Sequence, residues 1–261
     1  MRAQEDGDMR GLKDKILIVA GGGSGIGAAT ARRLAEEGAI LAIGDIVETA
    51  AQQVAASIVG AGGRATGHAF DIASEASVAD LIKATVDLHG QLDGLHVNAA
   101  DMRALREDTD ASDISFDIFD RTITVNMRGH LICTKQAMPH LLKSHGALVY
   151  TTSEAAYVGE PTRVSYAMSK SGINALMRHV ASRWGREGVR ANAVAPGFTL
   201  TEEIDAQLPQ DARETFFTQV RSARLVSPED IAATVAFLLS DDAMSINGQV
   251  ISVDGGRLMR A

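Results

Sequence analysis

Short apolar runs alternate with amphipathic stretches along the whole chain. The runs are apolar on successive residues, which is typical of strands buried on both faces of a sheet. They predict seven strands: Ile16 to Ala20, Ile40 to Gly44, Ala65 to Phe70, Gly94 to Asn98, Ala147 to Thr151, Ala191 to Ala195 and Gln249 to Val253. Strands that alternate with helices predict an α/β fold, a doubly wound parallel sheet with helices on both faces.

Helical stretches such as Glu48 to Val59 and Ser77 to His89 separate the strands. The chain contains no internal repeat, low-complexity segment or linker, so we predict a single domain over residues 11–261. Residues 1–10 are polar at their start and are predicted to form a flexible N-terminal tail.

Two segments interrupt this regular pattern. The acidic segment from Asp101 to Asp120 follows the fourth strand, and the segment from Thr199 to Val226 follows the sixth. Both leave the carboxyl ends of strands, where open α/β sheets bind ligands. We expect residues 199–226 to form a lid over the substrate, while a plain surface loop is the alternative for each segment.

Composition narrows the class of protein. Of 261 residues, 46% are hydrophobic and 22% are charged, and the formal net charge is −8. A negative charge argues against nonspecific binding to nucleic acid or to anionic membranes. The N-terminus lacks the apolar core of a secretory signal, and the single cysteine, Cys133, fits a reducing compartment. We therefore expect a cytoplasmic protein that acts on small molecules, with no metal site suggested by the histidine spacing.

A glycine-rich loop joins the first strand to the first helix. The sequence Gly21-Gly22-Gly23-Ser24-Gly25-Ile26-Gly27 opens onto an alanine-rich helix over residues 28–37. Glycines let the backbone approach a pyrophosphate closely, and the helix N-terminus offers free N–H groups. A flexible glycine linker would lack the flanking strand and helix, so the pattern favours a dinucleotide site.

Tyr166 and Lys170 lie four residues apart, which places both on one face of a helix with about 5–6 Å between their Cβ atoms. An ammonium group beside a phenol favours the phenolate and lowers the tyrosine pKa. Such a pair can transfer a proton to or from an alcohol or carbonyl oxygen. Taken alone, the same spacing also describes a solvated pair on a surface helix.

The ordered motifs from Leu12 to Gly256 resemble the short-chain dehydrogenase/reductase family, in its subtype of this chain length. The resemblance implies a Rossmann-type sheet and hydride transfer between a nicotinamide cofactor and a secondary alcohol or ketone. It also implies a catalytic tetrad of Asn126, Ser153, Tyr166 and Lys170. In the family the tyrosine acts as acid or base, the serine binds the substrate oxygen, the lysine also holds the nicotinamide ribose, and the asparagine serves a water-linked proton relay.

The same resemblance assigns the cofactor site. The expected binding residues are Gly21, Ser24, Gly25, Ile26, Gly27, Asp45, Asp71, Ile72, Asn98, Tyr166, Lys170, Pro196, Gly197, Thr199 and Thr201. Val97 and Ala100 depart from the family pattern, which usually has asparagine and glycine at these positions. The extra methyl group of Ala100 is expected to narrow the substrate space near the nicotinamide.

Asp45 ends the second predicted strand and favours NAD over NADP. A carboxylate at this position can accept hydrogen bonds from both adenosine ribose hydroxyls, and it would repel a 2′-phosphate. No arginine lies within Gly21 to Gly27 or directly after Asp45. A solvated aspartate that starts a turn is the alternative interpretation.

Three other functions remain open. An NADP-linked carbonyl or 3-oxoacyl reductase would share the motifs, as would a catalytically silent NAD-binding sensor or scaffold. A sugar-nucleotide epimerase also uses the tyrosine and lysine, but it normally needs a longer C-terminal substrate region. The sequence does not identify the substrate, although an apolar pocket for a cyclic or aryl alcohol is suggested by Ala100, Met102, Tyr157, Phe198 and Phe216.

The family resemblance also predicts assembly. Members of this size usually pack two long helices against a twofold-related subunit, and here these would be Phe116 to Lys143 and Val164 to Arg183. We therefore expect a homotetramer, or a homodimer, with closed symmetry.

Overall fold

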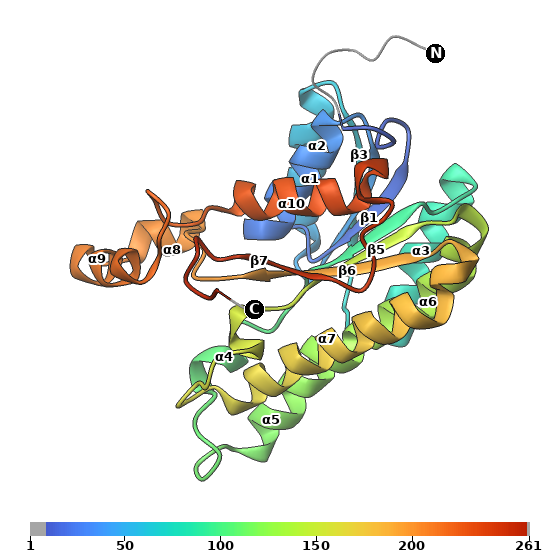
Figure 1. Ribbon diagram of the computed structural model, residues 1–261. Coiled ribbons are helices and arrows are strands. Elements are labelled where there is room, and N and C mark those ends of the chain that lie inside the picture. The colour runs from blue at the N-terminus through green and yellow to red at the C-terminus, as the bar shows by residue number, and fades with distance from the viewer. Residues whose placement is uncertain (1–8, 260–261) are drawn as a thin grey trace.

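A computed structural model describes residues 9–259, and its seven parallel strands form one sheet in the order β3-β2-β1-β4-β5-β6-β7 (Figure 1). The order reverses between β1 and β4, which makes the ends of these two strands the switch point where such sheets bind ligands. The strands are β1 Ile16–Ala20, β2 Ile40–Asp45, β3 Arg64–Ala69, β4 Gly94–Val97, β5 Ala147–Thr151, β6 Arg190–Pro196 and β7 Val250–Val253.

Burial distinguishes the centre of the sheet from its edges. Every residue of β1, β4 and β5 is buried, as the continuous apolar runs predict. The edge strands differ, because β3 pairs only with β2 and β7 only with β6. Arg64 and Ala69 of β3 are exposed, and all four residues of β7 are partly buried. The prediction of strands buried on both faces therefore holds for the interior of the sheet alone.

Helices cover both faces and create two hydrophobic cores (Figure 1). One core packs α3, α6 and α7 against the sheet, with Leu81, Ile132 and Met177 among its residues. The other packs α1, α2 and α10, with Leu34 and Val235 among its residues. The bounds are α1 Gly25–Glu36, α2 Glu48–Gly60, α3 Glu75–His89, α6 Gly129–Ser144, α7 Val164–Trp184 and α10 Pro228–Leu239.

The helix predicted over Phe116 to Lys143 is interrupted. α5 spans Phe116–Ile123, a π-helical turn follows at Thr124–Arg128, and α6 begins at Gly129. A π turn holds one more residue than an α turn, and such turns occur frequently at functional sites. Asn126 lies in the middle of this turn.

The two irregular segments contain short helices. α4 is Ala104–Glu107, α8 is Glu202–Gln207 and α9 is Gln210–Gln219. α8 and α9 project from one side of the molecule (Figure 1), and the segment that carries them is closed at its base. Thr199 forms a bridge with Val226, and the Leu200 amide donates to the Val226 carbonyl at 2.8 Å. This closed base is compatible with the predicted lid. Single 3₁₀ turns complete the chain at Glu154–Ala156, Gly185–Glu187 and Asp241–Ala243.

Residues 1–8 of the predicted tail lie outside the described part of the chain. The next two residues are bonded to the body: the Met9 amide donates to Glu37 Oε2 at 2.7 Å, and Arg10 pairs with Asp242. None of the helices within residues 9–259 is both long and apolar enough to span a membrane.

Candidate active site

α7 and the end of β5 bring Ser153, Tyr166 and Lys170 together. Lys170 Nζ lies 5.4 Å from the centroid of the Tyr166 ring and donates to the Thr151 carbonyl at 2.9 Å. The Ser153 hydroxyl forms a hydrogen bond with the Tyr166 phenol. The lysine is 1% exposed, so its aliphatic stem and amine are enclosed by protein. The predicted reactive groups therefore share one small, largely buried volume.

Burial raises the pKa of the Tyr166 phenol, and the Ser153 hydroxyl and the Arg163 charge oppose that rise. Burial also lowers the pKa of Lys170 to about 7. The sequence predicted that Lys170 would lower the tyrosine pKa, and the structure instead gives an upward shift. An amine with a pKa of about 7 carries only part of a positive charge at neutral pH, so its field on the phenol is weak.

The first turn of α7, which carries Tyr166, is capped by a distant residue. Arg163 occupies the N-cap position with φ +64° and makes no side-chain cap bond. Asp108 supplies the cap: its carboxylate accepts from the Ser165 amide at 3.2 Å, the Ser165 hydroxyl at 3.0 Å and the Tyr166 amide at 2.8 Å. Sequence analysis singled out the acidic segment around Asp108 but not this residue, because its partners lie more than fifty positions away.

Asn126 is fully buried in the π turn between α5 and α6. Its Oδ1 accepts from the Asp101 amide at 2.8 Å, which ties the segment after β4 to the helix. Its Nδ2 has no hydrogen-bond partner among residues 9–259 and is shielded from solvent. An amide donor in this position can hold a water molecule, as the predicted relay requires.

A line of hydrogen bonds connects Lys170 to the glycine loop across three strands. Lys170 binds the Thr151 carbonyl, and Thr151 Oγ1 donates to Asn98 Oδ1 at 3.0 Å. Asn98 Nδ2 then donates to the Gly21 carbonyl at 2.9 Å. His96 Nε2 also lies 2.8 Å from Thr151 Oγ1. The predicted cofactor residue Asn98 thus links the lysine end of the site to the glycine loop.

The glycine loop fits a dinucleotide. Gly21 has φ +84°, and a Cβ there would lie 2.6 Å from the Ala99 Cα. A Cβ at Gly27 would overlap the Gly21 carbonyl oxygen. Ser24 is the N-cap of α1, yet its hydroxyl makes no cap bond, so the first turn of Gly25 and Ile26 presents its amides to a ligand. These features suit a pyrophosphate at the helix N-terminus.

Asp45 lies beside the glycine loop, where its Oδ2 accepts from the Gly23 amide at 2.8 Å and its Oδ1 from the Val47 amide at 3.0 Å. Each carboxylate oxygen can accept a second hydrogen bond, which leaves capacity for two ribose hydroxyls. Ile46 and Val47 follow as exposed apolar residues. Asp45 therefore offers hydrogen-bond acceptors to a ribose. Neither Ile46 nor Val47 offers a positive charge to a 2′-phosphate.

Asp71 and Ile72 follow β3. Asp71 Oδ1 accepts from the Ala73 amide at 2.9 Å, and Ile72 is buried against Gly129 at the start of α6. This contact places the predicted cofactor residues Asp71 and Ile72 next to the π turn.

Pro196 ends β6, and the turn after it is tied to β7 by the Gly197 amide, which donates to the Val253 carbonyl at 3.1 Å. Thr199 Oγ1 donates to the Gly197 carbonyl at 3.1 Å. Thr201 caps α8, and its methyl carbon lies 3.4 Å from the position of a Cβ at Gly25. The base of the lid segment thus faces the glycine loop.

The residues predicted to form an apolar pocket are only partly brought together. Phe198 and Phe216 stack with ring centroids 3.7 Å apart and planes 3° apart. Met102 and Tyr157 are exposed, at 56% and 37%. The aromatic stack therefore connects the Pro196–Gly197 turn to α9, while Met102 and Tyr157 lie on the surface and Ala100 is partly buried.

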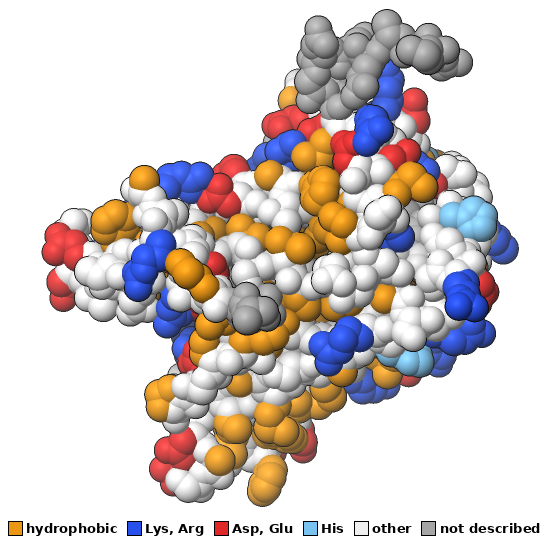
Figure 2. All heavy atoms as spheres, viewed as in Figure 1, with side chains coloured by type: hydrophobic (Ala, Val, Ile, Leu, Met, Phe, Trp, Pro, Cys, Tyr) orange, Lys and Arg blue, Asp and Glu red, His pale blue; other side chains and the backbone are white. Residues whose placement is uncertain are grey.

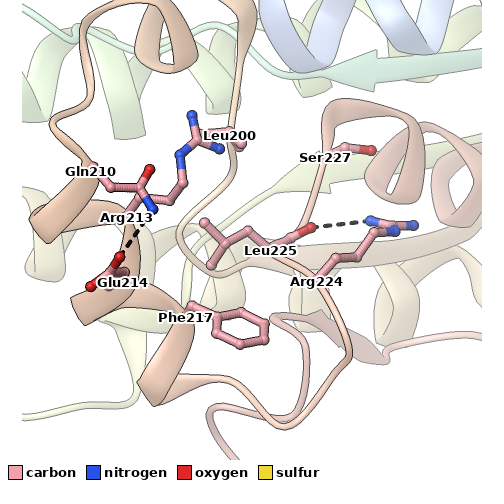
Figure 3. Close-up of a pocket in the computed structure, with 8 residues that line it drawn as sticks. All are labelled: Leu200, Gln210, Arg213, Glu214, Phe217, Arg224, Leu225 and Ser227. Atoms are coloured by element: carbon pink, nitrogen blue, oxygen red, sulfur yellow. Dashed lines mark hydrogen bonds between the residues drawn. The ribbon is translucent and has the colours of Figure 1, made fainter.

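A separate cavity of about 470 Å³ lies between α9 and the base of the lid segment (Figure 3). Gln210 Nε2 donates to Glu214 Oε1 at 3.1 Å along one wall, and Arg224 donates to the Leu225 carbonyl at 3.1 Å on another. Its lining contains none of the predicted catalytic or cofactor residues: Leu200, Gln210, Arg213, Glu214, Phe217, Arg224, Leu225 and Ser227.

Comparison with known proteins gives consistent matches over almost the whole chain. The sequence model described as "Enoyl-(Acyl carrier protein) reductase" matches residues 20–257. Cis-4-hydroxycyclohexanecarboxylate dehydrogenase of Sinomonas cyclohexanicum is 38% identical over 93% of this chain and 96% of its own length. 7alpha-Hydroxysteroid dehydrogenase of Bacteroides fragilis is 33% identical over 95% and 96%. The crystal structure of levodione reductase superposes with a TM-score of 0.86 at 32% identity, over 94% of this chain and 98% of that one.

Proposed function

Because the chain belongs to the short-chain dehydrogenase/reductase family and is an oxidoreductase, we propose that it transfers a hydride between NAD(H) and a secondary alcohol or ketone. The observation that carries this proposal is the cluster of Ser153, Tyr166 and Lys170 near the end of β5, in which Ser153 and Lys170 are buried and Tyr166 is partly buried. A serine hydroxyl bonded to a tyrosine phenol can serve a single substrate oxygen from two sides.

The bound nicotinamide supplies the hydride chemistry, and the protein controls the proton. Tyr166 removes the alcohol proton during oxidation and returns it during ketone reduction. Ser153 donates to the same substrate oxygen and stabilises the charge that develops on it. Lys170 holds ribose hydroxyls, and Asn126 binds the water that carries the proton onward.

NAD is the proposed cofactor. The glycine loop holds the pyrophosphate through Gly21, Ser24, Gly25, Ile26 and Gly27. Asp45 binds the adenosine ribose. The adenine and nicotinamide sides are held by the remaining predicted residues: Asp71, Ile72, Asn98, Pro196, Gly197, Thr199 and Thr201. The two oxygens of Asp45 and the apolar residues after it support this choice. An NADP-linked carbonyl or 3-oxoacyl reductase is the second candidate, and the similarity to a 3-oxoacyl-[acyl-carrier-protein] reductase of Thermotoga maritima, 30% identical, favours it.

We propose a cyclic secondary alcohol as substrate, because two relatives are named for ring compounds that carry a hydroxyl group. Residues 199–226 act as the lid of the single domain over this substrate. The enzyme is proposed to be cytoplasmic, which the buried free thiol of Cys133 supports.

A Tyr166→Phe variant tests the proposal. It keeps the aromatic ring and removes the hydroxyl, so NADH binding should persist while turnover of the best alcohol in a substrate panel falls roughly 10²–10⁴-fold. Tyr150→Phe is the matched control, since it removes a buried hydroxyl that bonds Thr134 away from the site. Turnover by Tyr166→Phe at the wild-type rate would remove this residue from the mechanism. A wild type that binds NADH but oxidises no alcohol in the panel would favour a sensor or scaffold.

A further inference from the structure

The residue after Ser153 carries a buried carboxylate that the proposed reaction does not use. Glu154 begins the short turn after β5 and is 8% exposed. Its Oε1 pairs with Arg257 from the segment that follows β7. Its Oε2 is shielded from solvent and accepts no hydrogen bond from any residue between 9 and 259. A buried carboxylate oxygen without a partner is costly, and such groups are usually satisfied when the site is in use.

This free oxygen lies close to the groups proposed to carry out the reaction. Glu154 Oε2 lies 3.3 Å from the position of a Cβ at Gly197, in the turn that follows β6. Ser153 precedes Glu154 in the chain, so the residue that carries this carboxylate adjoins the group proposed to bind the substrate oxygen, and its Oε2 adjoins the turn proposed to hold the nicotinamide. The negative charge of Glu154 is also close enough to Tyr166 to raise the pKa of its phenol.

The pair with Arg257 is not needed to hold the C-terminal segment in place. The Gly255 carbonyl already accepts from the Arg221 amide at 2.7 Å and the Ser222 amide at 3.0 Å. Asp254 also accepts from the Leu258 amide at 3.0 Å. Arg257 instead fixes the orientation of the Glu154 carboxylate and neutralises its charge, which leaves one oxygen directed away from the pair.

We propose that Glu154 Oε2 accepts a hydrogen bond from a second hydroxyl group of the substrate, on a carbon near the one that reacts. An ionised carboxylate only accepts hydrogen bonds, so it selects a donor and disfavours an ether or carbonyl at the same place. Glu154 is therefore a residue that determines specificity, and diols are the substrate class it selects. This inference rests on the proposed function, because it places the second hydroxyl relative to the carbon that the proposed reaction oxidises.

Three alcohols that differ at one position test the inference: 1,2-cyclohexanediol, cyclohexanol and 2-methoxycyclohexanol. Their binding is measured by calorimetry with saturating NAD in a Tyr166→Phe background, where the proton cannot be removed. Their kcat/KM values are measured with the enzyme that retains Tyr166. We expect the diol to be favoured over cyclohexanol about tenfold to hundredfold, as for a hydrogen bond to a charged group. The methyl ether should bind more weakly than the diol by a similar factor.

Two substitutions of Glu154 distinguish its oxygen from its shape. In Glu154→Gln, Arg257 holds the amide oxygen, so the NH₂ group replaces Oε2 and an acceptor becomes a donor. The ratio of methyl ether to diol affinity should then rise at least about tenfold relative to the enzyme with Glu154. Glu154→Leu removes both functions, and the ratio of diol to cyclohexanol should fall close to one. Glu160→Gln is the matched control, since the Glu160 carboxylate pairs with Arg163, and its ratios should equal those of the wild type.

The possible outcomes separate the two claims. Equal binding of diol and cyclohexanol by the wild-type Glu154 enzyme overturns the inference, and so does an unchanged diol preference in Glu154→Leu. Should Glu154→Leu fail to fold, the ether-to-diol ratio of Glu154→Gln decides alone, and an unchanged ratio overturns the inference. A diol preference in binding without oxidation of any alcohol supports the inference and refutes the proposed reaction. Oxidation of all three alcohols at equal kcat/KM supports the proposed reaction and refutes the inference.

Discussion

Lys170 places an amine in an environment that disfavours its charge. It is 1% exposed, and burial lowers its pKa from 10.5 to about 7. Each pKa unit corresponds to about 1.4 kcal/mol of preference between protonation states. Burial of this side chain therefore lowers the stability of the folded protein, and it produces an amine that can exchange a proton near neutral pH.

Replacing Lys170 by methionine should stabilise the protein and inactivate it. The free energy of unfolding should rise by on the order of a few kcal/mol below pH 7. Loss of the hydrogen bond to the Thr151 carbonyl reduces this gain. It should shrink as the pH rises from about 7 toward 10.5, because the unfolded lysine then also becomes neutral. Thermal unfolding at pH 7 and pH 10 measures this, with the exposed Lys143→Met as control. A Tm below that of the wild type at pH 7 would contradict the argument.

Asp45 should determine cofactor choice through its two acceptor oxygens. A hydrogen bond to a charged group contributes about 1.5–3 kcal/mol, roughly tenfold to hundredfold in affinity. The wild type should therefore prefer NAD by at least about tenfold in kcat/KM, and Asp45→Ser should lose much of this preference by weakening NAD. Both cofactors must be compared at one ionic strength, since salt screens the repulsion of a phosphate. Equal kcat/KM values of the wild type with NAD and NADP would show that Asp45 does not select the cofactor through its ribose.

At the scale of the element, α7 depends on a cap that comes from another segment. Asp108 accepts both the Ser165 and Tyr166 amides, and loss of an N-cap typically costs about 0.5–2 kcal/mol. We expect Asp108→Ala to lower stability by this amount and to lower kcat by up to about 10²-fold, because small displacements of a reacting group are that costly. The KM for the cofactor should change little. Asp113→Ala, at an exposed position of the same segment, is the control, and equal kcat in both variants would rule out a positioning role for Asp108.

The sequence predicts the elements that local patterns encode. All seven strands begin and end within one residue of their predicted bounds, because apolar runs and glycine or proline breaks are local signals. The glycine loop and the tyrosine–lysine spacing also lie where the sequence places them. The π turn at Asn126, the cap by Asp108 and the free oxygen of Glu154 could not be predicted in this way. Each depends on residues that meet only after the sheet has formed.

At the scale of the whole molecule, apolar side chains remain exposed on the helices predicted to form a subunit interface. Figure 2 shows hydrophobic side chains gathered over α5 and α7 at the bottom of the view. Phe116 is 77% exposed, Leu131 of α6 is 53% exposed and Met168 of α7 is 51% exposed. Contiguous exposed apolar surface commonly marks an interface. A homotetramer, or a homodimer, that buries this surface is therefore our proposal for the assembly.

Sedimentation at micromolar concentration should show this oligomer for the wild type and smaller species for the double variant Leu131→Asp, Met168→Asp. A self-complementary interface presents each introduced charge twice, so the cost of burying unpaired like charges adds to the loss of apolar contact. Leu88→Asp, at an exposed position of α3, is the matched control and should leave the mass unchanged. A wild type that sediments only as monomer would refute the assembly.

The π turn between α5 and α6 gives this helix pair an unusual response to the loss of a single residue. An α-helix advances about 100° per residue, so one residue added to a regular helix would rotate everything after it by that angle, whereas a π turn takes up the added residue within the turn itself. Deleting one residue within Thr124–Arg128 would therefore restore a regular helix in which α5 and α6 keep their relative orientation. The exposed ring of Phe116 would then keep its direction, while the turn that holds the buried amide of Asn126 would be lost. In this segment the number of residues therefore constrains the chain as strongly as their identity.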